Sequence, residues 1–229
     1  MEYKIVFAMI YIESKKRKYE RLLKEYPKAD ILDITSTTEV KYAQLLSPFY
    51  PHGNIPIPFS SGYTAMSVEG IWQGLKVFES CGIDMASFKN DTMSGLKRTV
   101  RKYGKPLGHQ KGINSEELLG YFDARMLIYL PSYLWVLENV PSVKNIISRI
   151  KERSKDNDIV FLDYNTNADF RDISSPLSHA GLVKLYIEGN YPQKGEVYAP
   201  LTDEEIRQKK ESKKQKAKSK SSQEQLNLF

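Results

Sequence analysis

A chain of 229 residues, of which 41% are hydrophobic, is long enough for one larger domain or for a domain and a tail. Its single cysteine excludes an intrachain disulfide and a cysteine metal cluster, and the start has no signal-peptide pattern, so we expect a cytoplasmic location. The net charge of +6 belongs to the tail, because the segment from Ile206 onward holds eight of the 34 bases and two of the 28 acids. Such a tail is typical of a salt-sensitive contact with nucleic acid or of a disordered solubilising segment.

The order of apolar and polar residues predicts both strands and helices. The first apolar run is rich in Val, Ile, Phe and Tyr and carries charges, which favours a buried strand over a membrane span. Helices dominate without a regular βαβ rhythm, so we expect an α+β fold, a helix-rich domain with a small sheet. In chain order we predict a strand over residues 3–12, a helix over 15–26, a strand over 28–34 and a loop-rich segment over 47–63. Helices follow over residues 67–82 and 91–103, and then a loop over 102–112. The last predicted elements are a helix over 115–139 with a kink or break at Pro131, a helix over 141–154, a strand over 158–164 and a helix over 174–189.

The segment over residues 67–79 has two different faces when it is drawn as a helix. Four apolar residues fall on one arc, and the opposite arc carries an acid, an indole, an amide and an amine. A face of this kind is usually in contact with solvent. Alternatively, its carboxylate could act as a general base or stabilise an oxocarbenium ion, and its ring could stack on a base. The four residues are Glu69, Trp72, Gln73 and Lys76.

Two stretches in this region together carry a resemblance to a known family. SPFYP at residues 47–51, followed by SVEGIWQGLKVF at residues 67–78, resembles the NADAR superfamily (NAD- and ADP-ribose-associated proteins). That family has an Asn-Phe-Tyr-type loop and then a helix with the pattern Ser-x-Glu-His-x-x-Gln-x-x-Lys-Phe. The resemblance extends over residues 46–189, and DYNTNADFRD and SSPLSHAGLVKLY correspond more loosely to the family's later part. Four residues keep the spacing of the helix pattern: Ser67, Glu69, Gln73 and Lys76.

The sequence departs from the family pattern at three positions. Gly70 stands where the family usually has His. Val77 is an additional residue before the phenylalanine of the pattern, and Pro48 stands where the loop usually has Asn. The missing His leaves the substrate and the rate of reaction open.

The resemblance implies hydrolysis of an N-glycosidic bond in a nucleotide-like or ADP-ribosyl substrate. Known activities of the family include cleavage of a riboflavin-pathway intermediate and removal of ADP-ribose from modified guanine in nucleic acid. By position, the resemblance implies Glu69 as the catalytic carboxylate and Lys76 as a residue that assists it by charge or by orienting the sugar. It implies neither a metal nor another cofactor. The substrate-binding residues that it implies are Phe49, Tyr50, Trp72 and Gln73.

A polar loop follows the predicted strand at residues 158–164. Its acids and amides could bind a divalent cation or sugar hydroxyls, or they could form turns by local hydrogen bonds. The loop lacks the spacing of an EF-hand. We retain Asp169 as a catalytic candidate and Asn165 as a substrate-binding candidate, and we expect His179 at the edge of the core. His52 and His109 are expected in loops.

The last nine residues, SSQEQLNLF, place two leucines and a phenylalanine after a lysine-rich stretch. This end resembles the bacterial sliding-clamp-binding peptide, Gln-Leu-(Ser/Asp)-Leu-Phe, and departs from it only at Asn227. Such an extended peptide places its Leu and Phe side chains in a hydrophobic pocket of the partner. The alternatives are the Gln-x-x-Leu-x-x-Phe spacing of archaeal and eukaryotic clamp ligands, or an apolar end that docks on its own domain. The resemblance implies the DNA sliding clamp as a partner, bound through Gln225, Leu226, Leu228 and Phe229.

These features together predict three parts: a strand–helix–strand extension over residues 1–45, a NADAR-like domain over 46–200, and a disordered lysine-rich tail with the clamp-binding peptide over 201–229. The predicted function is N-glycosidic hydrolysis brought to replicating DNA. One alternative is a non-enzymatic adaptor or inhibitor that binds the clamp. Another is a clamp-tethered enzyme that modifies DNA bases in a different way. We expect no contact with a membrane.

Overall fold

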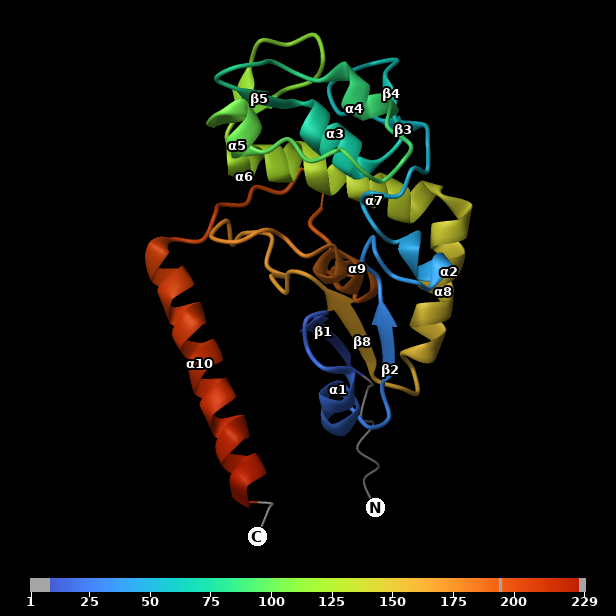
Figure 1. The fold of residues 1–229 in the computed structure, drawn as a ribbon, viewed down its shortest axis with the longest axis vertical. Coiled ribbons are helices and arrows are strands. Elements are labelled where there is room, and N and C mark those ends of the chain that lie inside the picture. The colour runs from blue at the N-terminus through green and yellow to red at the C-terminus, as the bar shows by residue number, and fades with distance from the viewer. Residues whose placement is uncertain (1–8, 194, 227–229) are drawn as a thin grey trace.

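The computed structural model describes residues 9–193 and 195–226, and in this part of the chain the predicted α+β class is confirmed. Figure 1 shows a long central helix with a group of elements on either side of it. A small parallel sheet and its helices lie on one side. Short helices and antiparallel strands lie on the other.

The central helix is continuous from Tyr121 to Asn139, so the predicted alternative of a break at Pro131 does not occur, and the helix instead has an irregular turn just before the proline. The turn before Pro131 is π-helical, because the N–H of Leu130 donates to the carbonyl oxygen of Arg125 five residues earlier. This wider turn leaves room for the proline ring, which in an α-helix would meet the carbonyl of the preceding turn. The helix consists of α6 (Tyr121–Ala124), η1 (Arg125–Tyr129) and α7 (Leu130–Asn139).

The parallel sheet has the strand order β1–β8–β2, with β1 (Ile10–Ser14), β8 (Ile159–Asp163) and β2 (Asp30–Asp33). Phe161 in the middle of β8 is paired with one residue of β1 and one of β2. The predicted division at residue 45 does not match this arrangement. The strands before residue 45 flank β8 on both sides, so they belong to the same structural unit as the rest of the domain.

Both faces of this sheet are covered, as its apolar strands require. Val160 and Leu162 of β8 pack with Leu22, which lies in the helix that follows β1. The alternating residues Ile159 and Phe161 point into the main core on the other face. The helices around the sheet are α1 (Tyr19–Glu25), α2 (Lys41–Gln44), α8 (Pro141–Arg153) and α9 (His179–Ile187).

The predicted helix over residues 67–82 is wrong in its second half, because α3 (Val68–Gly74) ends early and β5 (Lys76–Phe78) follows it. A side-chain carbon at position 74 would lie only 2.2 Å from the ring of Phe88, so the close packing at the end of α3 leaves room only for glycine. Pairing of β5 with a neighbouring strand overrides the helical pattern here. The other elements on this side are β3 (Ile55–Pro56), β4 (Thr64–Ala65), α4 (Met85–Lys89), α5 (Val100–Tyr103), β6 (Pro106–Gln110) and β7 (Leu118–Leu119). Of these, α5 is shorter than the predicted helix over residues 91–103, and β6 is a strand within the predicted loop over 102–112.

The tail differs from the predicted disorder, because the structure has a helix, α10 (Asp203–Leu226), which Figure 1 shows projecting away from the domain. Its first turn holds three acids, which interact favourably with the helix dipole, and the rest is rich in good helix formers such as Lys, Gln and Glu. Leu228 and Phe229 of the predicted clamp-binding peptide lie outside the described residues. Among the helices described, none is long and apolar enough to cross a membrane.

Candidate active site

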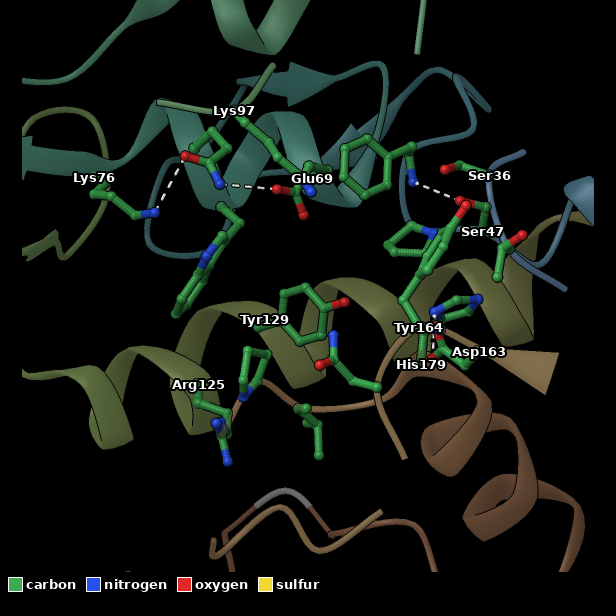
Figure 2. A pocket seen from close by; sticks show the side chains of 18 of the residues that line it. Ser36, Ser47, Glu69, Lys76, Lys97, Arg125, Tyr129, Asp163, Tyr164 and His179 are labelled. Atoms are coloured by element: carbon green, nitrogen blue, oxygen red, sulfur yellow. Dashed lines mark hydrogen bonds and ion pairs between the residues drawn. The ribbon is translucent and has the colours of Figure 1, made fainter. Parts of the chain in front are cut away.

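A cleft of about 440 Å³ lies where the two groups of elements meet against the central helix (Figure 2). One wall comes from α3 and β5, and the opposite wall comes from the carboxyl ends of β2 and β8 and the start of α9. The volume is within the range of small-molecule sites. Of the eight residues predicted for catalysis or substrate binding in the domain, six line the cleft: Phe49, Glu69, Trp72, Gln73, Lys76 and Asn165.

Glu69 is the buried carboxylate of the wall that α3 and β5 form, the upper wall in Figure 2, and its relative exposure is 8%. Its Oε1 accepts a hydrogen bond from Gln73 Nε2 at 2.8 Å, and Ser67 caps the helix by accepting from the N–H of Gly70 at 3.0 Å. Burial raises the pKa of Glu69, against the opposing effects of the Gln73 hydrogen bond and of Lys76. The predicted polar face of α3 is therefore turned into the protein rather than toward solvent.

The orientation of the Gln73 amide is determined by its neighbours. Its Oε1 accepts from the Lys76 ammonium at 3.2 Å and from the backbone N–H of Arg98 at 3.1 Å. The Nε2 is therefore the atom that faces Glu69. Gln73 therefore holds the carboxylate of the catalytic candidate in place.

Lys76 is half-buried at the start of β5 and not on α3, yet it reaches the same cleft. Burial lowers the pKa of Lys76, as does the Arg98 guanidinium, whereas Glu69 raises it. Its ammonium lies 5.8 Å from the centre of the Trp72 ring. The cleft thus contains a carboxylate and an amine that are both hydrogen-bonded to the Gln73 side-chain amide.

Aromatic rings form the apolar part of the cleft. Trp72 packs against His109 with ring centres 3.8 Å apart and meets Tyr121 and Tyr129 edge-on at 5.8 Å and 5.6 Å. His109 lies in β6, in contrast to the predicted loop, and neither ring nitrogen has a hydrogen-bond partner among the described residues. Burial lowers the pKa of His109 to about 3, so the ring under Trp72 is neutral. Phe49, on the upper wall, lies under the Lys97 ammonium at 5.7 Å.

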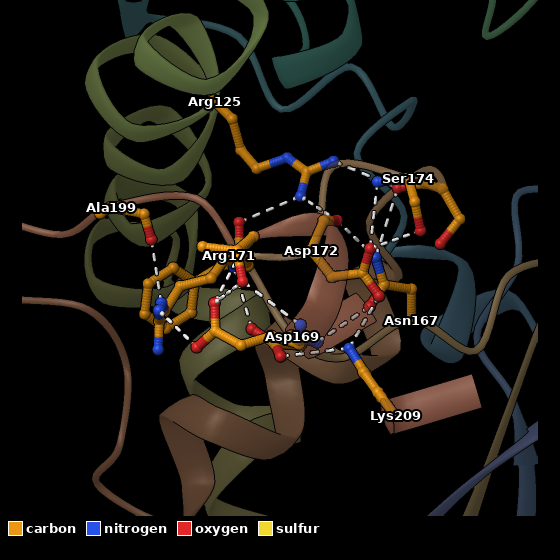
Figure 3. A network of polar contacts seen from close by, with 12 residues as sticks. Arg125, Asn167, Asp169, Arg171, Asp172, Ser174, Ala199 and Lys209 are labelled. Atoms are coloured by element: carbon orange, nitrogen blue, oxygen red, sulfur yellow. Dashed lines mark hydrogen bonds and ion pairs between the residues drawn. The ribbon is translucent and has the colours of Figure 1, made fainter. Parts of the chain in front are cut away.

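The central helix lines the cleft with Tyr121, Arg125 and Tyr129, at spacings of four residues. Arg125 has a relative exposure of 2%, and its guanidinium donates to the carbonyl oxygens of Phe170 and Asp172 at 3.0 and 2.8 Å (Figure 3). It therefore fixes the loop after β8 against the helix. Its donors are used within the protein, so it is a structural clamp for this loop.

A buried ion pair lies in the opposite, lower wall, between the end of β8 and the start of α9. The Asp163 carboxylate lies 3.0 Å from Nδ1 of His179, and Nε2 of His179 donates to the carbonyl oxygen of Ile34 at 2.8 Å. Burial alone would lower the pKa of His179, but Asp163 outweighs it and raises that pKa. Burial would raise the pKa of Asp163, but His179 and Ser178 hold it at about 2. Both ring nitrogens of His179 are occupied, so this pair is part of the framework.

Two of the predicted site residues are absent from the cleft. Tyr50 packs on His52, with ring centres 4.8 Å apart, instead of lining the substrate pocket. Asp169 binds Lys209 of α10 at 3.1 Å, and Asp172 binds the same ammonium at 2.8 Å (Figure 3). Asp169 therefore connects the loop to the tail helix and lies outside the cleft, in contrast to its predicted place in the site. No group of three or more acids, histidines or cysteines in the described chain is arranged to hold a metal ion.

Several cleft residues were not predicted from the sequence. Lys97 lies in a loop before α5, where a helix over residues 91–103 was predicted, and Thr35 and Ser36 follow a strand that was assigned to a separate extension. A usable signal did exist for Asp163, because an acid at the end of a predicted parallel strand is typical of binding sites in α/β sheets. The other unpredicted residues that line the cleft include Tyr121, Arg125, Tyr129, Tyr164 and His179.

The sequence was compared with known families and proteins. A family model described as a family of unknown function (DUF6939) matches residues 14–183. The chain belongs to this family. The match begins at the end of β1 and ends within α9, so it includes both walls of the cleft. A search of curated proteins gave no match.

Proposed function

We propose that the protein hydrolyses an N-glycosidic bond in a nucleotide-like or ADP-ribosyl substrate, with Glu69 as the catalytic carboxylate. The observation that carries this proposal is the buried carboxylate of Glu69, held by Gln73 beside the Trp72 ring. Trp72, Tyr129 and Phe49 offer planar apolar surfaces of the kind that bind a base. The NADAR-like spacing in the sequence supports the same reaction.

In this reaction Glu69 accepts a proton from water while the water oxygen bonds to the anomeric carbon. The C–N bond breaks, and its electron pair leaves with the base. A carboxylate with a raised pKa is a stronger base than an ordinary glutamate, and it remains ionised above that pKa. The Lys76 ammonium lies on the same wall, where it can orient the sugar or support the leaving group by its charge.

The test is incubation of the protein and its Glu69→Gln variant with NAD, with ADP-ribose and with DNA that carries ADP-ribosylated guanine. Mass spectrometry of the products detects a released base or released ADP-ribose. Release by the wild type alone supports the proposal. No release from any of the three substrates contradicts it.

The pH dependence offers a separate check on the role of Glu69. Because only the ionised carboxylate accepts a proton, kcat/KM is expected to fall with acid at a pH above 4.5, the ordinary pKa of this side chain. The Gln73 hydrogen bond lowers the pKa of Glu69, so Gln73→Leu is expected to move this acidic limb to higher pH. A pH profile of kcat/KM for both proteins measures the shift. A limb that stays in place, or moves to lower pH, contradicts the assignment.

A second candidate is a non-enzymatic adaptor or inhibitor that acts through the sliding clamp. The observation that favours it is Gly70, because a side-chain carbon there would lie 2.6 Å from the backbone oxygen of Ser87 and 3.0 Å from Ser67 Oγ. The histidine of the family pattern therefore has no room at this position. In both candidates the C-terminal peptide supplies the contact with the clamp, at the end of α10.

We predict that the double substitution Leu228→Ala and Phe229→Ala weakens binding to a bacterial sliding clamp at least tenfold. The two side chains are the apolar anchors of the peptide. Surface plasmon resonance with immobilised clamp measures the loss, and Lys220→Ala is the control for a general effect of the tail. Equal binding by the double variant and the wild type would exclude this partner. If the double variant loses the biological effect of the protein and Glu69→Gln retains it, the adaptor is the better account.

The cytoplasm is the compartment that we propose for the protein. The single cysteine and the proposed contact with replicating DNA both suit a reducing compartment. The lysine-rich tail offers contacts with nucleic-acid phosphates near the clamp, and these would weaken with salt.

A further inference from the structure

Tyr164 is an exposed aromatic residue that lines the cleft. It is the first residue after β8 and has a relative exposure of 47%. Figure 2 shows Tyr164 and Lys76 at opposite ends of the cleft. The Tyr164 ring is therefore separate from the aromatic group around Trp72.

The Tyr164 ring is held at both ends although it is exposed. Its hydroxyl shares a hydrogen bond of 2.7 Å with Thr37 Oγ1. Its backbone N–H donates to the buried Asp163 carboxylate at 2.7 Å. The Lys15 ammonium lies 5.8 Å from the ring centre, and a salt bridge of 2.6 Å to Asp33 fixes that ammonium.

A ring that is fixed before a ligand arrives loses little conformational entropy on binding. A tyrosine at the surface usually packs its ring or leaves it free to rotate. Here the polar contacts hold a ring that lines the cleft, and among the described residues no other aromatic ring packs against its faces. Such a face is suited to stacking on a planar group, and stacking on an aromatic side chain is a general way of binding nucleobases.

The surroundings of Tyr164 are typical of a ligand site. The ring lies at the carboxyl ends of parallel strands, where open sheets bind their ligands. Thr35, Ser36 and Asn165 also line the cleft and offer polar groups. Thr35 and Ser36 lie in the part of the chain that the NADAR resemblance does not include.

We propose that Tyr164 forms a second ring-binding subsite, which stacks on a nucleobase next to the one bound beside Trp72. The ligand would therefore contain two bases joined through sugar and phosphate. It would be either a free dinucleotide or two neighbouring residues of a nucleic-acid strand. This inference rests on the proposed function for the chemistry at the Glu69 end.

The test measures binding to the Glu69→Gln variant, in which turnover does not interfere, by isothermal titration calorimetry. The probes are AMP, NAD and a single-stranded DNA tetramer. Adding Tyr164→Leu is expected to weaken binding of a two-base probe by about 5- to 150-fold, the effect of losing one base stack, and to leave AMP within about twofold. Tyr164→Phe keeps the ring and is expected to lose much less. Tyr42→Leu, at an exposed tyrosine outside this cleft, is the matched control.

A selective loss for NAD identifies a free dinucleotide, and a selective loss for the tetramer identifies a strand. The subsite is excluded if Tyr164→Leu leaves both two-base probes unchanged, if AMP weakens equally, or if no probe binds at millimolar concentration. Selective loss without any Glu69-dependent turnover keeps the subsite and rejects the glycosidase. Turnover that depends on Glu69 but not on Tyr164 supports the glycosidase and rejects the subsite.

Discussion

Replacement of Glu69 by glutamine is expected to lower kcat/KM by about 10²- to 10⁴-fold, the usual contribution of a positioned general base. Glutamine has the same shape and can still accept the hydrogen bond from Gln73, but it cannot take a proton from water. The folded state is not expected to suffer, because the substitution removes a buried group whose pKa is raised by burial. Steady-state kinetics and thermal unfolding on the same preparations separate the two effects.

The matched control for this variant is Asp169→Asn, another acid replaced by its amide. Asp169 contacts Lys209 outside the cleft, so its turnover is expected to stay within a few-fold of the wild type. A large loss with Asp169→Asn and none with Glu69→Gln would reverse the two assignments. Equal activity of Glu69→Gln and wild type would remove Glu69 from the mechanism.

Asp163→Asn is expected to destabilise the fold by about 3–5 kcal/mol, the usual cost of removing one partner of a buried ion pair. The substitution leaves His179 enclosed without its carboxylate, and it weakens the contacts with Ser178 and with the backbone N–H of Tyr164. Urea unfolding followed by tryptophan fluorescence measures the free energy of unfolding. Asp169→Asn again serves as the control, because its partly exposed bridge to Lys209 contributes at most about 1 kcal/mol.

The same pair predicts a pH dependence of stability. The folded-state pKa of Asp163 is lowered to about 2 from 3.8, so its contribution is present above 3.8 and is lost as the pH falls through about 2. The folded-state pKa of His179 is raised from 6.5, so its contribution is present below 6.5 and is lost as the pH rises through the raised value. The difference between wild type and Asp163→Asn is therefore expected to be largest between about pH 4 and 6.5. A difference that grows toward alkaline pH would contradict the ion pair.

The sequence by itself determined the fold class and much of the upper wall of the cleft. The short segment over residues 158–164 was predicted as a strand, and β8 is that strand, with alternate residues packed on its two faces. Glu69, Trp72 and Gln73 were found from their spacing on one helix face, and such local periodicity is readable because it depends on neighbours in sequence. Lys76 was found by the same pattern, although it lies in a strand, because β5 follows α3 directly.

Only the tertiary structure decided which distant segments complete the cleft. β8 lies between two strands that precede it by more than a hundred residues, and no local pattern encodes such a pairing. The pairing brings Asp163 to His179 and fixes Tyr164 beside the loop after β2. The same reason explains Asp169, whose partner Lys209 lies in a tail helix that the charge pattern alone did not predict. Side-chain roles that depend on such contacts are set by packing between remote parts of the chain. Composition and hydrophobic periodicity therefore do not predict them.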